Sequence, residues 1–351
     1  MSRVVVDVFR GVKNSLIHMK PHKTVQVTVL LAARNEETNI IRCLENIEVA
    51  MKHTALSVEV LIGNDASTDQ TGELVSHWID NKPHFQLIHI QNNLLHLKAK
   101  ANVLAQLAQQ ARGECFFITD ADISVPPSWF DTLWQSYQNG QHIVTGLTLI
   151  KNESLNTSWQ NIEWLLSLYV IYTLSERGIP VTAMGNNMLV SKKAYEAVGG
   201  YEGIPFSITE DFELFKQVVE KGFGFKNLYQ KEILAWSEPC IGFHALLRQR
   251  KRWMHGAMKS SWLLKIPLLI NSFQWLLWPV FFMLWPVPSL VAFGLKYSFQ
   301  LLLLLRLHAL LDLRPRFIAI LTYEFYVTFV YALLMPYYFW PKPTLWKERR
   351  L

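Results

Sequence analysis

Two aspartates, Asp120 and Asp122, lie on either side of Ala121 directly after the apolar run CFFIT. Residues two apart in an extended backbone project from the same face, so both carboxylates point the same way. Carboxylate oxygens at this spacing suit Mg²⁺ or Mn²⁺, which typically takes one or two protein carboxylates and completes its shell with water and substrate phosphates. The alternative is a pair of solvated acids in the turn before Pro126, and the pattern alone is consistent with both interpretations.

Other polar residues follow or precede apolar runs nearby. Asp65 closes the run LIGN, where its carboxylate could accept from a base N–H or a ribose hydroxyl, although an Asp there also suits a helix N-cap. Arg34 and Glu36 follow an earlier run, and Lys98 and Lys100 precede a helical stretch. Their positions favour contacts with a nucleotide and its phosphates. Lysines that merely cover a solvated helix end are the alternative.

Asp211 lies in a segment with the pattern of a helix from Thr209 to Gly222. Acids in a first turn usually interact with the helix dipole. A carboxylate across a metal from an activated donor would also serve as general base, because an acceptor hydroxyl must lose its proton as it attacks. Upstream, Gly185 and Asn186 permit close backbone approach and amide hydrogen bonds to a sugar, and a plain turn explains them equally well.

The basic stretch RQRKRW has helical spacing that places Gln249 on one face with Arg252 and Trp253. A planar guanidinium suits a diphosphate, and an indole suits the wall of an acceptor cavity. Taken alone, the stretch is more typical of a basic helix whose long side chains extend to a membrane surface.

The segments that must position these residues alternate short apolar runs with helical stretches, which is typical of an α/β sheet covered by helices. This order implies parallel strands with right-handed crossovers, whose ligand site lies outside their carboxyl ends. The acids lie at those ends. We predict strands at 25–33, 56–67, 85–90 and 114–122, and helices at 36–51, 68–80 and 99–111.

Composition divides the 351 residues into two regimes. Charge and periodic patterning fill the first three quarters of the chain and almost vanish between residues 266 and 340. We therefore predict three parts: a basic amphipathic segment at 1–25, a catalytic domain at 26–260, and membrane helices, transmembrane or re-entrant, at 261–351. The N-terminal segment shows no secretory signal, and a plain soluble helix there is the alternative.

The net charge of +6 comes from Lys and Arg residues that cluster at the N-terminus, at 248–252 and around the apolar segments. This distribution predicts contact with anionic membrane lipids rather than nucleic acid. Three widely separated cysteines, Cys43, Cys115 and Cys240, have neither the spacing of a zinc site nor that of a closed disulfide framework. We expect the catalytic domain to be cytoplasmic, in a reducing compartment.

Two stretches near the C-terminus are candidate membrane segments. Residues 266–295 carry no charge and would either span the bilayer or fold back, because prolines interrupt them. Residues 317–340 carry only Glu324, which we expect to face protein, water or the interface, because an acid in lipid is costly. The leucine-rich connection at 299–316 contains several charges and is predicted to form an interfacial helix. The number of membrane spans and their orientation in the bilayer stay open.

Taken in chain order, the motifs ARNEE, NDAS, KAKAN, TDAD, GNN, TED and QRKRW resemble the motif series of glycosyltransferase family 2. The resemblance runs from about residue 25 to about residue 253. It implies the inverting GT-A fold, a mostly parallel α/β sheet flanked by helices, followed here by membrane helices. The order and spacing of the whole set are far more specific than any single motif.

The resemblance also implies roles for individual residues. Asp65 would bind the nucleoside of a nucleotide-sugar donor. Asp122 would hold the divalent metal, with Asp120 nearby. Asp211 would be the catalytic base that deprotonates the acceptor.

Gln249, Arg252 and Trp253 match the Q/R-x-x-R-W signature shared by processive polysaccharide synthases and ceramide glucosyltransferases. Polymer-extruding members surround the catalytic domain with spans at both ends, whereas this sequence shows no N-terminal span. We therefore expect transfer of one or a few sugars from a nucleotide-diphosphate sugar, UDP being the family's usual default, to a lipid or another membrane-delivered acceptor. A nucleotidyltransferase, which would release pyrophosphate, and a non-catalytic membrane binding or assembly module are the alternatives.

Overall fold

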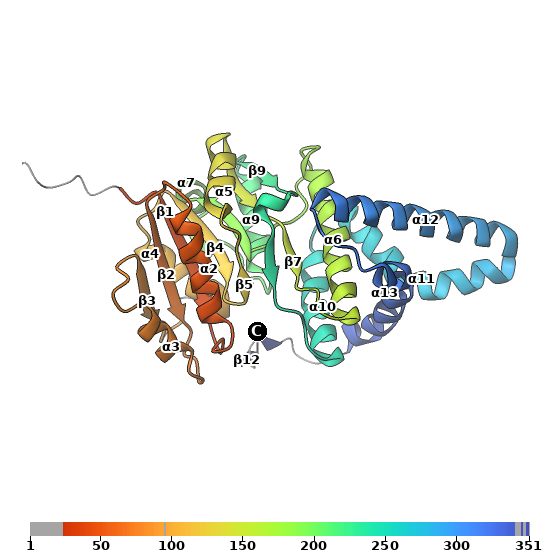
Figure 1. Ribbon diagram of the computed structural model, residues 1–351, viewed down its shortest axis with the longest axis horizontal. Helices are drawn as coiled ribbons and strands as arrows, with labels where there is room; N and C mark the ends of the chain where they lie inside the picture. The colour runs from red at the N-terminus through yellow and green to blue at the C-terminus, as the bar shows by residue number, and fades with distance from the viewer. Residues whose placement is uncertain (1–23, 95, 341–344, 347–348, 351) are drawn as a thin grey trace, which may run out of the picture.

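The computed structural model describes residues 24–94, 96–340, 345–346 and 349–350. The amphipathic segment expected at 1–25 lies outside these residues except for its last two positions. Figure 1 shows two parts side by side: a sheet covered by helices in the N-terminal part of the chain, and long helices towards the C-terminal end.

Four parallel strands form one half of a seven-stranded sheet, whose full order is β3-β2-β1-β4-β8-β6-β9. β1 and β2 are buried at every position because helices cover both faces, which explains their near-continuous apolar sequences. The register pairs Ala33 with Asn64 and Ala32 with Asp120, so the carboxyl ends meet at one edge. The four strands confirm those expected from the sequence: β1 (Val27–Ala33), β2 (Val58–Asn64), β3 (Phe85–His89) and β4 (Cys115–Asp120).

The later strands extend the structure around that edge. β8 runs antiparallel to β4 and pairs Asn187 with Thr119, which places the residues before β8 next to the end of β4. A three-stranded sheet, in the order β5-β10-β7, pairs Ser237 with Ile123 just beyond Asp122. The sequence analysis does not predict these strands: β5 (Ile123–Ser124), β6 (Gln141–Thr145), β7 (Thr148–Ile150), β8 (Asn187–Ser191), β9 (Gly224–Asn227), β10 (Ala235–Ser237), β11 (Leu345–Trp346) and β12 (Arg349–Arg350).

Helices pack on both faces of the large sheet. In β1, Val29 and Leu31 share a core with α2, while Leu30 shares a second core with α4. Successive side chains thus enter opposite layers, as the two-residue period of a strand requires. The three helices expected between the strands are confirmed as α2 (Ile40–Lys52), α3 (Thr71–Trp78) and α4 (Ala99–Gln110). The helix expected from Thr209 to Gly222 is confirmed as α9 (Glu210–Glu220). The others in this part are α5 (Trp129–Gln138), α6 (Leu155–Ser175), α7 (Lys192–Ala197), α8 (Gly200–Gly203), a 3-10 turn at Lys231–Ile233 and α10 (Phe243–Ala257).

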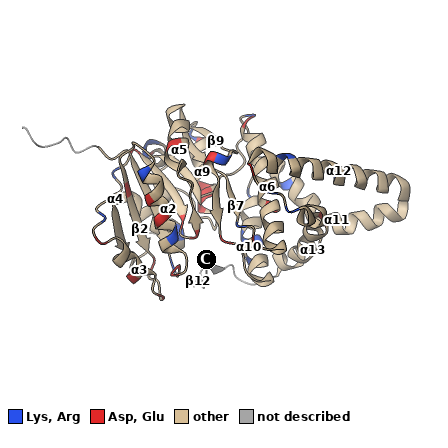
Figure 2. Cartoon of the chain, in the orientation of Figure 1, with Lys and Arg blue, Asp and Glu red and all other residues tan. Residues whose placement is uncertain are grey.

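Among the residues that the structure describes, three helices are each long and apolar enough to cross a membrane by length and composition: α11 (Trp262–Leu284), α12 (Pro286–Leu310) and α13 (Phe317–Phe339). α11 and α12 form a hairpin that extends away from the sheet and carries few charged residues (Figure 1, Figure 2). α13 contacts α6 and α10. The α/β sheet followed by long apolar helices confirms the expected fold class.

The chain folds back at Trp285, between α11 and α12. Each of these helices is long and apolar enough to cross a membrane, so whether residues 266–295 span it or enter and leave on one side stays a prediction. Pro286 and Pro288 begin α12 instead of breaking a helix, since a proline in the first turn has no intrahelical hydrogen bond to lose. The separate interfacial helix expected at 299–316 is wrong. The leucine-rich stretch continues α12 to Leu310 because its side chains pack against the core, and residues 311–316 form only the link to α13.

A polar cluster joins the three apolar helices. The Lys296 ammonium of α12 forms an ion pair with Glu324 of α13 and donates to Gln274 Oε1 of α11 at 3.2 Å. Glu324 is 3% exposed, which confirms that it faces protein rather than lipid. Each charge compensates the other in surroundings where an unpaired charge would be costly.

Glu324→Leu should destabilise the protein, because it leaves the Lys296 ammonium without its carboxylate among apolar helices. The expected loss is about 3 kcal/mol, observed as a lower thermal unfolding temperature in detergent. The double variant Lys296→Met/Glu324→Leu should recover most of this loss, since it leaves no charge unpaired. Equal destabilisation by the single and double variants would contradict a role for the ion pair.

Candidate active site

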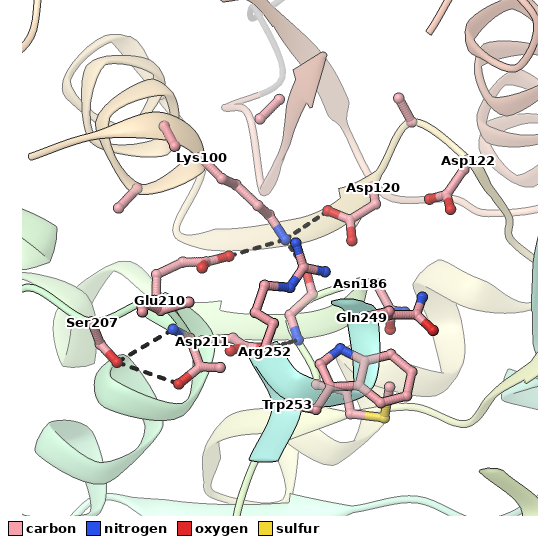
Figure 3. Close-up of a pocket in the computed structure, with 18 of the residues that line it drawn as sticks. Lys100, Asp120, Asp122, Asn186, Ser207, Glu210, Asp211, Gln249, Arg252 and Trp253 are labelled. Carbon is pink, nitrogen blue, oxygen red and sulfur yellow. Dashed lines mark hydrogen bonds and ion pairs between the residues drawn. The ribbon is translucent and has the colours of Figure 1, made fainter. Parts of the chain in front are cut away.

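A cavity of about 320 Å³ opens where the parallel strands end, with Ala32 of β1 and Asp120 of β4 in its wall. This is the place where ligands bind in open α/β sheets. Its lining brings together twelve of the thirteen residues that the sequence analysis selects, from six separate segments of the chain (Figure 3). The twelve are Arg34, Glu36, Lys98, Lys100, Asp120, Asp122, Gly185, Asn186, Asp211, Gln249, Arg252 and Trp253.

Asp65 is the selected residue that does not line this cavity. It is buried and follows β2, which is one strand further from β4 than β1. Arg34 Nη1 donates to the carbonyl oxygens of Asp65 and Ala66, at 2.5 and 2.9 Å. The Asp65 backbone is therefore tied to the cavity wall through Arg34, while its contact with a nucleoside stays a prediction.

The Lys100 ammonium lies at the centre of a half-buried charge cluster. Its Nζ is 2.6 Å from Asp120 Oδ1 and 3.3 Å from Glu210 Oε1, and it donates to Gly185 O at 3.4 Å. Burial would lower the pKa of Lys100, but the nearby carboxylates outweigh burial and raise it above its usual value. Burial raises the pKa of Glu210, and Lys100 opposes that rise. Lys100 therefore stays charged and links β4 to α9.

Lys98 and Lys100 take different places although they are two residues apart. Lys100 is in the first turn of α4 and points into the cavity, whereas Lys98 precedes the helix, with its Nζ 5.9 Å from the centre of the Phe206 ring. The sequence alone could not tell which of the two lysines would pair with the carboxylates of the cavity, because that depends on where α4 begins.

Asp120 and Asp122 both project towards the cavity from the end of β4 (Figure 3). Asp120 interacts with Lys100, while Asp122 Oδ2 accepts from Ser237 Oγ at 3.4 Å. Across the part of the chain that the structure describes, no three or more His, Cys, Asp or Glu side chains gather to hold a metal. Two carboxylates fit Mg²⁺ or Mn²⁺ when water and phosphate oxygens complete the shell. The donor set thus fits the expected metal together with a phosphate-bearing ligand.

The Asp211 carboxylate is held by two backbone N–H groups. Gly185 N donates to Oδ2 at 2.7 Å, and Phe212 N donates to Oδ1 at 2.8 Å. A Cβ on residue 185 would lie 2.6 Å from the Asp211 Cβ, so any larger residue would force a shift. Glycine is required at 185 by this close approach, and the carboxylate is fixed in the wall of the cavity.

The helix α10 presents Gln249, Arg252 and Trp253 to the cavity, in agreement with the expected helical spacing. Within the same turn, the Arg250 guanidinium forms an ion pair with Glu163 of α6 at 2.7 Å and lies over the Trp253 ring at 4.4 Å. Arg250 is only 3% exposed. α10 is therefore a packed part of the site, not the membrane-surface helix that its sequence alone suggests.

The Arg250–Glu163 pair is a part of the site that sequence reasoning misses. Gln249 Oε1 accepts from Arg250 Nη1, and Trp164, next to Glu163, packs edge to face on Trp253 at 5.1 Å. The pair thus positions two residues of the cavity wall. One signal was present: Glu163 is the one charged residue in the stretch that forms α6, and a buried acid needs a partner.

Two family models match the chain. The model described as glycosyl transferase family 2 matches residues 28–199, and the model described as glycosyl transferase family group 2 matches residues 115–340, which is more than half of the chain. The chain belongs to glycosyltransferase family 2. Together the two matches include every segment that lines the cavity. The resemblance carried by the motifs is confirmed.

Curated relatives of this family 2 chain include two bacterial proteins. It is 30% identical over 239 residues to the poly-beta-1,6-N-acetyl-D-glucosamine synthase of Staphylococcus aureus, across 66% of this chain and 54% of that protein. It is 23% identical over 236 residues to the probable glycosyltransferase YdaM of Bacillus subtilis, across 66% of this chain and 55% of that protein. The chain spans about half the length of these curated relatives.

Among solved structures that resemble this family 2 chain, one matches along most of its length. It is the mannosyltransferase PcManGT from Pyrobaculum calidifontis in complex with GDP-Man and Mn²⁺, and the match covers 88% of this chain and 86% of that one. The TM-score is 0.53 and the sequence identity is 19%, so the likeness is one of fold. It confirms a mixed, mostly parallel sheet like that of GT-A transferases.

Gly185→Ala should displace the Asp211 carboxylate, because the added Cβ needs the space of the Asp211 Cβ. Sugar transfer should fall by about 100-fold, the loss that a misplacement of about 1 Å can cause. The rate of transfer is measured on detergent-solubilised protein. Gly294→Ala is the matched control, since a Cβ there meets no atom within 4 Å. Equal activity of the two variants would show that Asp211 does not depend on Gly185.

Proposed function

We propose that the chain is an inverting, metal-dependent glycosyltransferase that transfers a sugar from a UDP-sugar to a lipid or other membrane-delivered acceptor. The observation that carries this proposal is the presence of Asp122 and Asp211 in the walls of one cavity, together with the cations Lys100 and Arg252. A leaving diphosphate needs positive charge, and an attacking hydroxyl needs a base. Membership of family 2 supports a nucleotide sugar as the donor.

The end of β4 is the proposed diphosphate end of the cavity. Asp122, with Asp120 beside it, would hold Mg²⁺ or Mn²⁺, and a bound ion would neutralise charge on the leaving diphosphate. Mn²⁺ accompanies GDP-Man in PcManGT. Arg252 binds the same diphosphate, because a planar guanidinium can donate two hydrogen bonds to phosphate oxygens.

The remaining polar residues bind the other parts of the donor. Asn186 is fixed for contact with the sugar, since its carbonyl accepts from Thr119 Oγ1 at 2.9 Å and its Oδ1 accepts from Thr148 Oγ1 at 3.1 Å. Gly185 permits close approach of the sugar to the backbone. The nucleoside and the phosphates next to it are bound near the ends of β1 and β2 by Arg34, Glu36, Asp65 and Lys98.

Asp211 is the proposed general base. Its carboxylate takes the proton of the acceptor hydroxyl while that oxygen forms a bond to the anomeric carbon. The bond from the anomeric carbon to the diphosphate oxygen breaks, and its electron pair leaves with the nucleoside diphosphate. Attack opposite the leaving group inverts the configuration of the sugar. Gln249 and Trp253 form the wall that positions the acceptor for this attack.

The membrane arrangement is part of the proposal. The catalytic domain at 26–260 lies in the cytoplasm, and α11, α12 and α13 of the C-terminal part hold it to the bilayer and contact membrane lipids. Free cysteines agree with a reducing compartment. The 30% sequence identity to a poly-beta-1,6-N-acetyl-D-glucosamine synthase favours a polymer as the second candidate product. A discrete glycolipid or a polysaccharide ladder from the purified enzyme distinguishes the two products.

Asp211→Asn should lower turnover by about 10²–10⁴-fold, because an amide cannot take the acceptor's proton. Donor affinity should be retained. The measurement is nucleoside diphosphate release by detergent-solubilised protein across a panel of nucleotide sugars, with Mn²⁺ or Mg²⁺ and a native membrane-lipid extract. Glu220→Gln, an exposed acid at the other end of α9, is the matched control. Lost donor affinity in Asp211→Asn would instead assign Asp211 to donor binding.

Asp122→Ala should remove the metal-dependent part of donor binding, because one of the two expected carboxylate ligands is lost. Calorimetric titration of the nucleotide sugar with Mn²⁺ and with EDTA measures that part. The variant in Mn²⁺ should bind as weakly as the unmodified protein in EDTA. Unchanged binding together with full activity would remove Asp122 from the metal site.

A further inference from the structure

A second cavity, of about 260 Å³, adjoins the first. Its walls come from α6 and α10 on one side and from α11 and α13 on the other. α11 and α13 are two of the helices that are long and apolar enough to cross a membrane. The second cavity therefore lies where the proposed catalytic part meets the membrane helices.

The two cavities have part of their walls in common. The shared residues are Trp164, Met184, Thr209, Asp211 and Trp253. Asp211, the proposed base, is thus reached from both cavities, whereas Asp120 and Asp122 line only the first. A molecule in the second cavity approaches Asp211 from a side that is separate from the proposed diphosphate end.

The second cavity is mainly apolar, in contrast to the charged first cavity. Of its charged side chains, Arg250 and Glu163 compensate each other in an ion pair at 2.7 Å. Sugar hydroxyls buried here would lose hydrogen bonds to water and find few partners, which costs free energy, whereas a hydrocarbon chain would not. The apolar lining includes Leu168, Ile171, Phe212, Met254, Leu268 and Leu334.

We propose that the second cavity binds one hydrocarbon chain of a lipid acceptor and so presents the hydroxyl of that lipid to Asp211. This inference rests on the proposed function and names the class of its acceptor. The bilayer supplies the chain directly, because Leu264 and Leu268 of α11 and Leu334 of α13 form the wall on the membrane side. Burial of the chain gives affinity, and the shared wall holds the hydroxyl near the base.

A photoreactive lipid tests this site. The whole chain is placed in nanodiscs of phosphatidylcholine and phosphatidylglycerol that contain a diacylglycerol with a diazirine in one acyl chain, irradiated, and mapped by mass spectrometry. Labels should appear on cavity residues of α6 and α10. Ser167 is an exposed residue of α6 that lines the cavity, so Ser167→Trp should fill part of it. The variant should reduce these labels about tenfold, as expected for overpacking a binding cavity.

Val170→Trp is the matched control, because Val170 is three residues further along α6, is 39% exposed and does not line the cavity. It should leave the labels on α6 and α10 unchanged. Equal labelling of the two variants, or labels confined to the outer faces of α11 and α12, would overturn the inference. If a soluble oligosaccharide, and not unlabelled diacylglycerol, protected the cavity residues from photolabelling, the inference would also be overturned, in favour of a glycan acceptor.

Donor binding shows whether a negative result contradicts the lipid site or the proposed function. It is measured by titrating the same samples with UDP-sugars. The unmodified protein and both variants should bind the donor with equal affinity, because neither substituted residue lines the first cavity. Intact donor binding without cavity labels would contradict the lipid site alone. Absent donor binding in the unmodified protein would contradict the proposed function.

Discussion

The geometry of the site depends on one half-buried ammonium, that of Lys100. It lies between Asp120 at the end of β4 and Glu210 at the start of α9, two segments that are far apart in the chain. Without this cation, the carboxylates of Asp120, Glu210 and Asp211 would repel one another in a space with little water to screen them. Lys100 therefore allows the protein to place several acids around one cavity, and it holds the sheet edge and α9 together.

A second buried pair extends this arrangement towards the membrane helices. Arg250 of α10 and Glu163 of α6 join the two helices whose Trp253 and Trp164 line both cavities. α6 is in turn attached to α13, since the Trp159 ring stacks on Tyr326 at 5.1 Å and Trp159 Nε1 donates to Thr322 Oγ1 at 3.0 Å. The same helix thus contributes to the active-site wall and to the contact with a membrane-type helix, so the two parts of the chain are mechanically connected.

The parallel half of the sheet could be predicted because its strands are nearly continuous apolar runs that end in polar residues, and parallel register then brings those residues to one edge. The later strands could not, because β5, β7 and β10 are only two or three residues long and show no period. Asp65 also ends a strand, yet it stays outside the cavity, since strand order decides which ends meet. The Arg250–Glu163 pair joins residues 87 positions apart, and no local pattern encodes such a contact.

The packing of α13 on α6 bears on how the protein can be truncated. A cut after Ser260 would follow the change in composition, but it would remove Tyr326 and the other α13 side chains that share a core with Leu165 of α6. The shortened chain would then expose a contiguous apolar face to water, which favours aggregation. A water-soluble fragment for crystallisation therefore needs polar substitutions on the α6 face, since α13 completes a core with α6.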